Sequence, residues 1–311
     1  MSSPRRHSFT YLLCLALLGL TAGQPLRAAT QADEVLATVN GQTVTEADLS
    51  FALLSRGITD APPALRQQLL EQLINQRLIQ EFLKAQKIEV PPKQLDESVV
   101  KVENFIRKKG DNPQQVLTKM GFTPEKLRAA IALPLAWNLY ARQEISPEKM
   151  QAYFNAHREE LDGTRVEASQ ILLKLSPNAS TTEIDQAKQK LLDLRKQIQS
   201  GKLSFAEAAA RHSQAPSKTE GGKLVTSAYR GKMPLVFTRQ VFPLKEGEIS
   251  EPFQSPFGMH LITLNKKHPG QFSLEDVRGE LFQTLSRELY DQTLQKLRST
   301  AKIEWKTETK P

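Results

Sequence analysis

The chain has 311 residues, of which 39% are hydrophobic and 24% are charged. This length allows about two ordinary domains, and the composition excludes a disordered, collagen-like or multi-span membrane chain. The formal net charge of +8 is spread along the sequence, and the longest uninterrupted basic run is Arg107-Lys108-Lys109. The charge therefore predicts weak attraction to acidic surfaces and no nucleic-acid site.

The first residues have the pattern of a secretory signal peptide. Arg5 and Arg6 precede an apolar run over residues 9–20, and small residues follow as far as Ala28, where we expect cleavage. The run is too short to span a bilayer comfortably, and an uncleaved anchor is the alternative. We therefore expect residues 1–28 to be a signal peptide, a periplasmic or otherwise exported mature chain, and no membrane span after cleavage.

Cleavage would also remove Cys14, the only cysteine of the chain. A mature chain without cysteine excludes disulfides, thiol catalysis and cysteine-ligated metals. The histidines show no metal-ligand spacing, and there is no phosphate loop or dinucleotide fingerprint. We therefore expect no metal ion and no cofactor.

Residues 33–160 are predicted to begin with a hairpin and to continue as helices. Apolar residues alternate over 35–39, Asn40-Gly41 is a hairpin turn signal, and Thr45 caps the helix that follows. Apolar periodicity and helix-start signals predict the later helices, and Pro134 predicts a kink or break. These helices span about residues 64–86, 93–109, 124–142 and 147–159.

After Gly163 the pattern changes to short strands and helices. The alternation and the turn residues predict strands, and capping boxes mark helix starts. The expected strands are 166–175, 224–229, 249–253, 259–265 and 302–305, and the expected helices are 182–199, 204–212 and 273–298. The mature chain is therefore divided into residues 33–160, 164–268 and 273–305.

Residues 164–268 resemble the parvulin type (PpiC-like) of peptidyl-prolyl cis-trans isomerase domain. The resemblance rests on ordered motifs: Ser-Gln-Ile-Leu in the first strand, Gly221-Gly222-Lys-Leu224, Gly-Lys-Met-Pro-Leu-Val-Phe237, Val-Phe-Pro-Leu244 and Phe-Gly-Met-His-Leu-Ile262. The predicted order of a strand, helices and short strands is also similar. The resemblance implies a four-stranded antiparallel sheet with surrounding helices.

The rest of the chain resembles the exported SurA- and PrsA-type foldase chaperones. These proteins have a signal peptide, a helical region that opens with a Val-Asn-Gly strand, a parvulin domain and a C-terminal helix. The resemblance implies an α+β chain in which residues 273–305 return to complete the mostly helical chaperone domain. It also implies that Ile303 and Trp305 pair with residues 35–39.

Prolyl isomerisation has an uncatalysed barrier of about 18–20 kcal/mol, because rotation about the peptide bond breaks amide resonance. A catalyst must hold the proline ring in a dry pocket and favour the twisted amide. The parvulin resemblance places this substrate-binding pocket on Leu224, Met233, Phe237 and Phe242. The alternative interpretation is that these four are ordinary core residues.

The polar half of the site departs from the parvulin pattern. His260 matches one of the paired histidines of the family, but Gln170 occupies the position of the other. Ala215 stands where the family has an acid or a thiol. Ser255 and Phe257 keep the usual hydroxyl and aromatic residues, and the resemblance makes both candidate substrate-binding residues. We expect Gln170 to exchange hydrogen bonds with His260, because an amide both donates and accepts. His260 and Gln170 are therefore the candidate catalytic residues.

Two functions follow from these residues. The first is an exported peptidyl-prolyl cis-trans isomerase and chaperone that acts on unfolded or nascent exported polypeptides and on their proline-containing segments. The alternative is a holdase chaperone whose parvulin domain binds peptides with little turnover, since Gln170 and Ala215 replace polar site residues. A structural interaction protein is a third class that the sequence leaves open.

Overall fold

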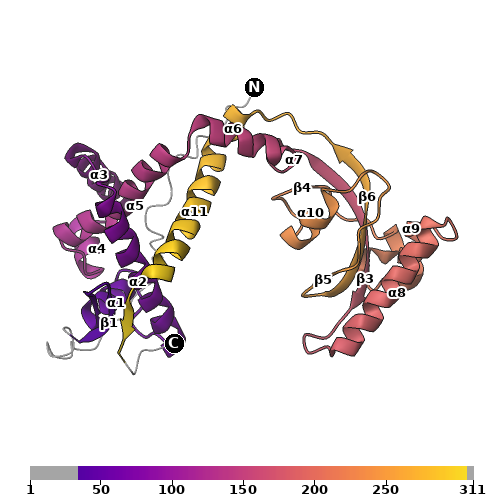
Figure 1. Cartoon of the computed structure of the whole chain (residues 1–311), viewed down its shortest axis with the longest axis horizontal. Coiled ribbons are helices and arrows are strands. Elements are labelled where there is room, and N and C mark those ends of the chain that lie inside the picture. The colour runs from indigo at the N-terminus through magenta and orange to yellow at the C-terminus, as the bar shows by residue number, and fades with distance from the viewer. Residues whose placement is uncertain (1–33, 307–311) are drawn as a thin grey trace. The chain divides into compact units, whose positions relative to one another are not determined.

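The computed structural model describes residues 34–306, so the expected signal peptide lies outside the described part of the chain (Figure 1). The described residues form two units. Unit 1 contains residues 34–146 and 284–306, and unit 2 contains residues 147–283. Each unit has its own hydrophobic core. None of the described helices is long and apolar enough to cross a bilayer.

Unit 1 contains a three-stranded antiparallel sheet in the order β2-β1-β7. Strand β1 (Val35–Val39) turns into β2 (Gln42–Thr45) through Asn40 and Gly41, which have φ values of 49° and 84°. Both residues thus have the positive φ that a two-residue hairpin turn needs. Strand β7 (Ile303–Trp305) pairs Ile303 with Val39 and Trp305 with Ala37, which confirms the expected pairing.

The helices of unit 1 cover this sheet and form a second apolar cluster beside it. The sheet packs against α1 and α2, and partly buried leucines of α11 join the same core. Helices α3, α4 and α5 bury the second cluster. The bounds are α1 Glu46–Leu54, α2 Pro63–Ala85, α3 Pro92–Lys108, α4 Pro113–Lys119, α5 Pro124–Glu144 and α11 Leu274–Thr300.

The sequence missed α4, and the break that was one alternative at Pro134 is absent, because α5 continues through this residue. Helix α4 has only seven residues, too few for a clear apolar periodicity. A proline removes one backbone donor from a helix. In α5 the flanking turns bury Ile131 and Leu135, so side-chain packing on both sides holds the helix together.

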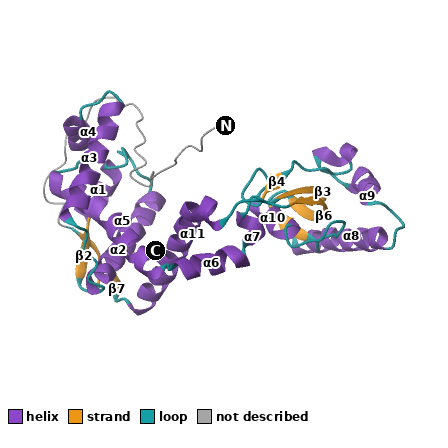
Figure 2. Cartoon of the chain, turned by 90° about the horizontal axis from the view of Figure 1, so that it is seen from above, coloured by secondary structure: helices purple, strands orange, loops and turns teal. Residues whose placement is uncertain are grey.

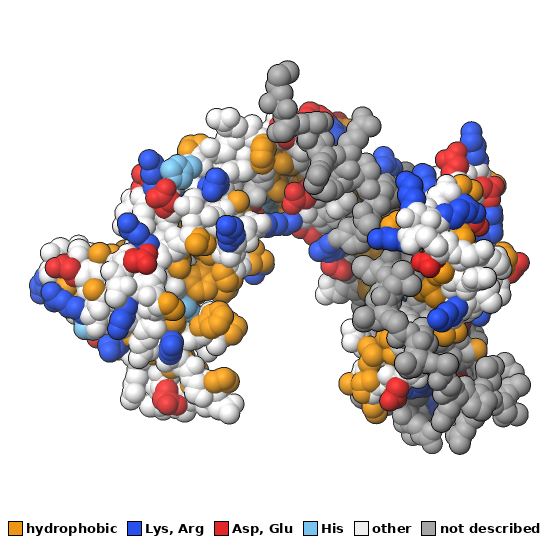
Figure 3. All heavy atoms as spheres, turned by 180° about the vertical axis from the view of Figure 1, so that it is seen from behind, with side chains coloured by type: hydrophobic (Ala, Val, Ile, Leu, Met, Phe, Trp, Pro, Cys, Tyr) orange, Lys and Arg blue, Asp and Glu red, His pale blue; other side chains and the backbone are white. Residues whose placement is uncertain are grey.

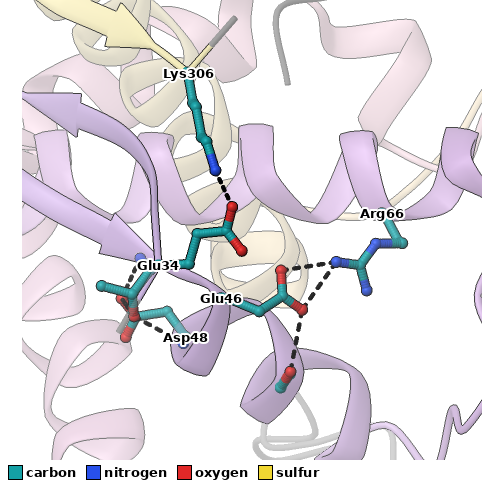
Figure 4. A network of polar contacts seen from close by, with 7 residues as sticks. Glu34, Glu46, Asp48, Arg66 and Lys306 are labelled. Carbon is teal, nitrogen blue, oxygen red and sulfur yellow. Dashed lines mark hydrogen bonds and ion pairs between the residues drawn. The ribbon is translucent and has the colours of Figure 1, made fainter. Parts of the chain in front are cut away.

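A polar network fixes the start of α1 (Figure 4). Thr45 and Asp48 form a reciprocal capping box, and the Glu46 carboxylate accepts hydrogen bonds from Arg66 of α2 at 2.8 and 2.9 Å. Lys306, next to β7, forms an ion pair with Glu34, next to β1. Exposed ion pairs of this kind contribute about 1 kcal/mol or less each to the free energy of unfolding.

Unit 2 is built on a four-stranded antiparallel sheet in the order β4-β3-β6-β5. The side chains of β3 alternate between two cores. Ile171 and Leu173 pack under α8 and α9, while Val166 and Ala168 pack on the opposite side with α10. Figure 1 and Figure 2 show the helices around this sheet. The bounds are α6 Pro147–Ala156, α7 Arg158–Leu161, β3 Arg165–Lys174, α8 Thr181–Gln199, α9 Phe205–His212, a 3-10 turn Pro216–Glu220, β4 Ser227–Ala228, α10 Leu235–Val241, β5 Phe253–Ser255 and β6 Gly258–His268.

Three sequence expectations for this region need correction. The strand predicted over 224–229 is only Ser227–Ala228, and the one predicted over 249–253 becomes a single bridge at Ile249 followed by β5. No helix was predicted at α10, because its seven residues are too few to show a clear apolar periodicity. By its internal contacts, unit 2 also includes residues 147–160 and 273–283.

Candidate functional site

The candidate site lies on the α10 side of the sheet in unit 2. Met233, Phe237 and Phe242 are buried there and pack with Leu224 and Phe253, which are partly buried. Leu224 is held at β3, because its backbone N–H donates to the Ala168 carbonyl at 2.8 Å. We call these five residues the apolar cluster. The structure thus brings together the four residues predicted for the proline pocket.

A chain of three polar side chains lies beside this cluster. The Ser255 Oγ and the His260 Nε2 are 2.7 Å apart, and the His260 Nδ1 and the Gln170 Oε1 are 3.1 Å apart. The predicted contact between Gln170 and His260 is therefore present. Strand pairing accounts for it. His260 on β6 lies opposite Leu172 on β3, and Gln170 is two residues from Leu172, so Gln170 and His260 are diagonal neighbours on the same face.

The hydrogen bonds also define where the protons lie. An amide oxygen can only accept, so the His260 Nδ1 carries the ring proton and donates it to Gln170. The Nε2 then accepts from the Ser255 hydroxyl, whose oxygen accepts the Phe257 N–H at 3.0 Å. In this arrangement each of these groups has a partner. The imidazole of His260 is therefore neutral in this series of hydrogen bonds.

Aromatic rings join the polar chain to the apolar cluster. The rings of Phe237 and His260 meet edge to face at a centroid distance of 4.7 Å, and the Phe253 ring stacks on His260 at 5.4 Å. Phe237 and Phe253 also touch each other at 5.3 Å. No role in the site was predicted for Phe253. The signal was available, because Phe253 lies two residues before Ser255 in a strand and so faces the same side.

Burial lowers the pKa of His260 to about 4. The side chain is 1% exposed, and a charged imidazole would lose its hydration among the Phe rings. The Ser255–His260–Gln170 chain therefore carries no charge near pH 7. A neutral and nearly dry arrangement of this kind suits the stabilisation of a weakly polar transition state better than proton transfer.

Phe257 differs from the other predicted substrate-binding residues. It lies in the turn between β5 and β6, and its side chain is 63% exposed, outside the apolar cluster. Val225 and Leu235 are also exposed in unit 2. In Figure 3, hydrophobic side chains gather in a patch on the face of unit 2 that carries α10 and β5. Phe257 is thus available for contact with a ligand at the surface, but not as part of a buried pocket.

Ala215 contributes no polar group. It is buried, and its backbone N–H donates to the Ser213 Oγ at 3.1 Å. The same oxygen accepts the N–H of Leu172 on β3 at 3.1 Å. The Ser213 hydroxyl therefore has a structural role, holding the end of α9 to the sheet. Of the described residues, no group of three or more His, Cys, Asp and Glu is placed to hold a metal ion.

Gly222 offers a test of how the backbone positions Gln170. It has a φ of +79°, its carbonyl accepts the Gln170 N–H at 2.8 Å, and a Cβ at this position would come within 2.2 Å of the Gln170 carbonyl oxygen. We expect Gly222→Ala to lower the free energy of unfolding by more than about 2 kcal/mol, since it adds a backbone clash to the usual cost of positive φ.

Gly201→Ala is the matched control, because Gly201 has a φ of +72° with open space around it. It should lose only about 1–2 kcal/mol. Urea unfolding of both variants measures the difference. Equal losses would show that the close approach at Gly222 does not constrain Gln170.

Comparison with known proteins agrees with this geometry. The PPIC-type PPIase domain family matches residues 171–266, and the SurA-like N-terminal domain family matches residues 7–139. The fold and the site therefore define a parvulin-type domain. The chain as a whole is similar to SurA and PrsA proteins.

Individual relatives match the chain at low identity. The chain is 26% identical to chaperone SurA of Thiobacillus denitrificans over 81% of its own length and 61% of that protein. It is 26% identical to a putative peptidyl-prolyl cis-trans isomerase SurA of Haemophilus influenzae, over 94% of this chain and 95% of that one. Foldase protein PrsA of Halalkalibacterium halodurans is 26% identical over 89% of this chain and 76% of that protein.

A solved peptidylprolyl isomerase, PrsA from Bacillus cereus, aligns over 90% of this chain and 96% of that one, with 19% identity and a TM-score of 0.49. The chain spans only 61%, 64% and 58% of three SurA chaperones that it matches.

Proposed function

We propose that this protein is an exported peptidyl-prolyl cis-trans isomerase and chaperone, with its active site on the α10 face of unit 2. The observation that carries the proposal is the direct contact between an apolar cluster and an uncharged polar chain, made where the Phe237 ring meets His260. A proline ring needs apolar walls, and the rotating amide needs a dry environment. This site offers both.

In the proposed mechanism the substrate proline ring packs on Met233 and Phe237. Methionine adapts its shape, whereas phenylalanine is a rigid wall. Binding removes water from the prolyl amide, and the twisted amide separates less charge than the planar one, so desolvation favours the transition state. His260 keeps its proton on Nδ1 throughout, and no bond to the substrate is formed.

The proposed clients are unfolded or nascent exported polypeptides with proline-containing segments. Support comes from the names of the relatives, which include a chaperone and a foldase, and from the SurA-like N-terminal domain. We place the protein in the periplasm or otherwise outside the cytoplasm, because residues 1–28 have the pattern of a signal peptide.

A holdase function is the second candidate. Gln170 and Ala215 favour it, because both replace polar groups that parvulins usually carry. The isomerase is the better-supported proposal, since the Gln170 amide still completes the hydrogen-bonded chain to His260.

Exchange NMR spectroscopy on a short X-Pro peptide with residues 29–311 tests the proposal, because it detects cis/trans exchange directly. We expect the protein to accelerate exchange above the uncatalysed rate, which corresponds to tens of seconds or more. Peptide shifts without faster exchange would contradict the isomerase and favour the holdase. An unchanged peptide spectrum would contradict both.

A further inference from the structure

One of the segments that build the candidate site is strongly basic. Between residues 213 and 245, the segment that supplies Leu224, Met233, Phe237 and Phe242, the only acid is Glu220. The same segment carries six bases, which are Lys218, Lys223, Arg230, Lys232, Arg239 and Lys245. The walls of the site are therefore built from a strongly basic stretch of chain.

Most of these bases have no acidic partner among the described residues. Arg230 faces Glu280 at 3.8 Å, but Lys218, Lys223, Lys232 and Arg239 form no ion pair within residues 34–306. Elsewhere in unit 2 some bases are paired with acids. The Arg195–Glu251 pair has a distance of 3.0 Å, and the Lys267–Glu159 pair has one of 2.7 Å. Lys218, Lys223, Lys232 and Arg239 therefore keep their charges available to an acidic ligand.

The unpaired bases lie next to the residues of the apolar cluster. Lys232 directly precedes Met233, and Lys223 directly precedes Leu224. Arg239 follows Leu235 by four residues on α10, so the two exposed side chains share a helix face while Phe237 turns into the core. Figure 3 shows Lys and Arg side chains beside the hydrophobic patch of this face.

We propose that the site selects prolyl segments that carry an acidic residue next to the proline. This inference rests on the proposed function and names its substrate class. We expect a Glu or Asp beside the proline to meet Lys232 and Arg239 when the ring contacts Met233, since neither base forms an ion pair within residues 34–306. The attraction acts at the surface, so it favours encounter and is screened by salt.

Three peptides that differ only at the residue before proline test this selection: Ala-Glu-Pro, Ala-Ala-Pro and Ala-Lys-Pro. At low salt we expect the wild-type protein to bind the Glu peptide about fivefold more tightly than the Ala peptide, and the Lys peptide more weakly than either. The double variant Lys232→Glu with Arg239→Glu should reverse this order. High salt should reduce the differences.

Lys188→Glu is the matched control, since Lys188 is exposed on α8 and belongs to the helix that packs on the other face of the sheet. It changes the charge but should leave the order of the peptides unchanged. Equal binding of the three peptides by the wild type would overturn the proposal, and so would an equal effect of Lys188→Glu. If no peptide exchanges faster but binding still ranks Glu first, the isomerase proposal fails and the selectivity stands.

Discussion

Replacing Phe237 by alanine should abolish the binding of prolyl peptides and destabilise unit 2. The ring is 5% exposed and touches both His260 and Phe253, so its removal opens the wall of the proposed pocket and leaves a cavity in the core. Truncation of a buried phenylalanine costs about 3–5 kcal/mol. Urea unfolding measures this loss, and peptide titration followed by NMR measures binding under conditions in which the variant is folded.

A variant with a similar loss of stability separates the two effects. Leu191 is fully buried under the opposite face of the sheet, and Leu191→Ala should cost about 2–5 kcal/mol. We expect it to leave peptide binding unchanged, and we expect Phe237→Leu to retain part of the binding because some apolar surface remains. If folded Phe237→Ala bound prolyl peptides as well as the wild type does, the pocket would not lie at this residue.

Acid should destabilise the protein through His260. Its pKa is lowered by burial from 6.5 to about 4, so in the window between these values the unfolded chain binds a proton that the folded chain does not. The stabilising effect of the neutral ring is therefore fully present above about pH 6.5, falls with decreasing pH, and is lost as the pH passes below about 4. At about pH 4 the loss is on the order of 3 kcal/mol.

The comparison with His260→Gln isolates this effect, because a glutamine does not titrate. The free energies of unfolding of both proteins are measured from neutral to acidic pH. We expect the wild type to lose on the order of 3 kcal/mol more than the variant across this window. Parallel curves would mean that His260 is not held neutral by its surroundings.

The strongest sequence predictions came from local signals. The hairpin at Asn40-Gly41 and the cap at Thr45 each depend on a few neighbouring residues, so the sequence placed both correctly. Helix α10 was missed, because its seven residues follow Pro234 and only contact with the sheet makes Phe237 and Val241 its buried side.

In the candidate site, too, some features could be predicted from the sequence, and others depend on tertiary contacts. The resemblance placed Gln170 beside His260, and the structure has that hydrogen bond. It could not place Phe253, whose stacking on His260 depends on the register between β5 and β6. Nor could it show that Phe257 is 63% exposed, because exposure depends on how the β5–β6 turn meets the rest of the sheet.

Methionine methyl NMR tests most directly the claim that the proline ring binds at the apolar cluster. The chain has five methionines, and Met233 belongs to this cluster, while Met259 is equally buried in the core on the other face of the sheet and Met150 is buried in α6. We expect a prolyl peptide to shift the Met233 methyl signal, with contacts to the proline ring protons, and to leave Met259 unchanged. A bound peptide that shifts other methionines and leaves Met233 unchanged would contradict binding at the apolar cluster.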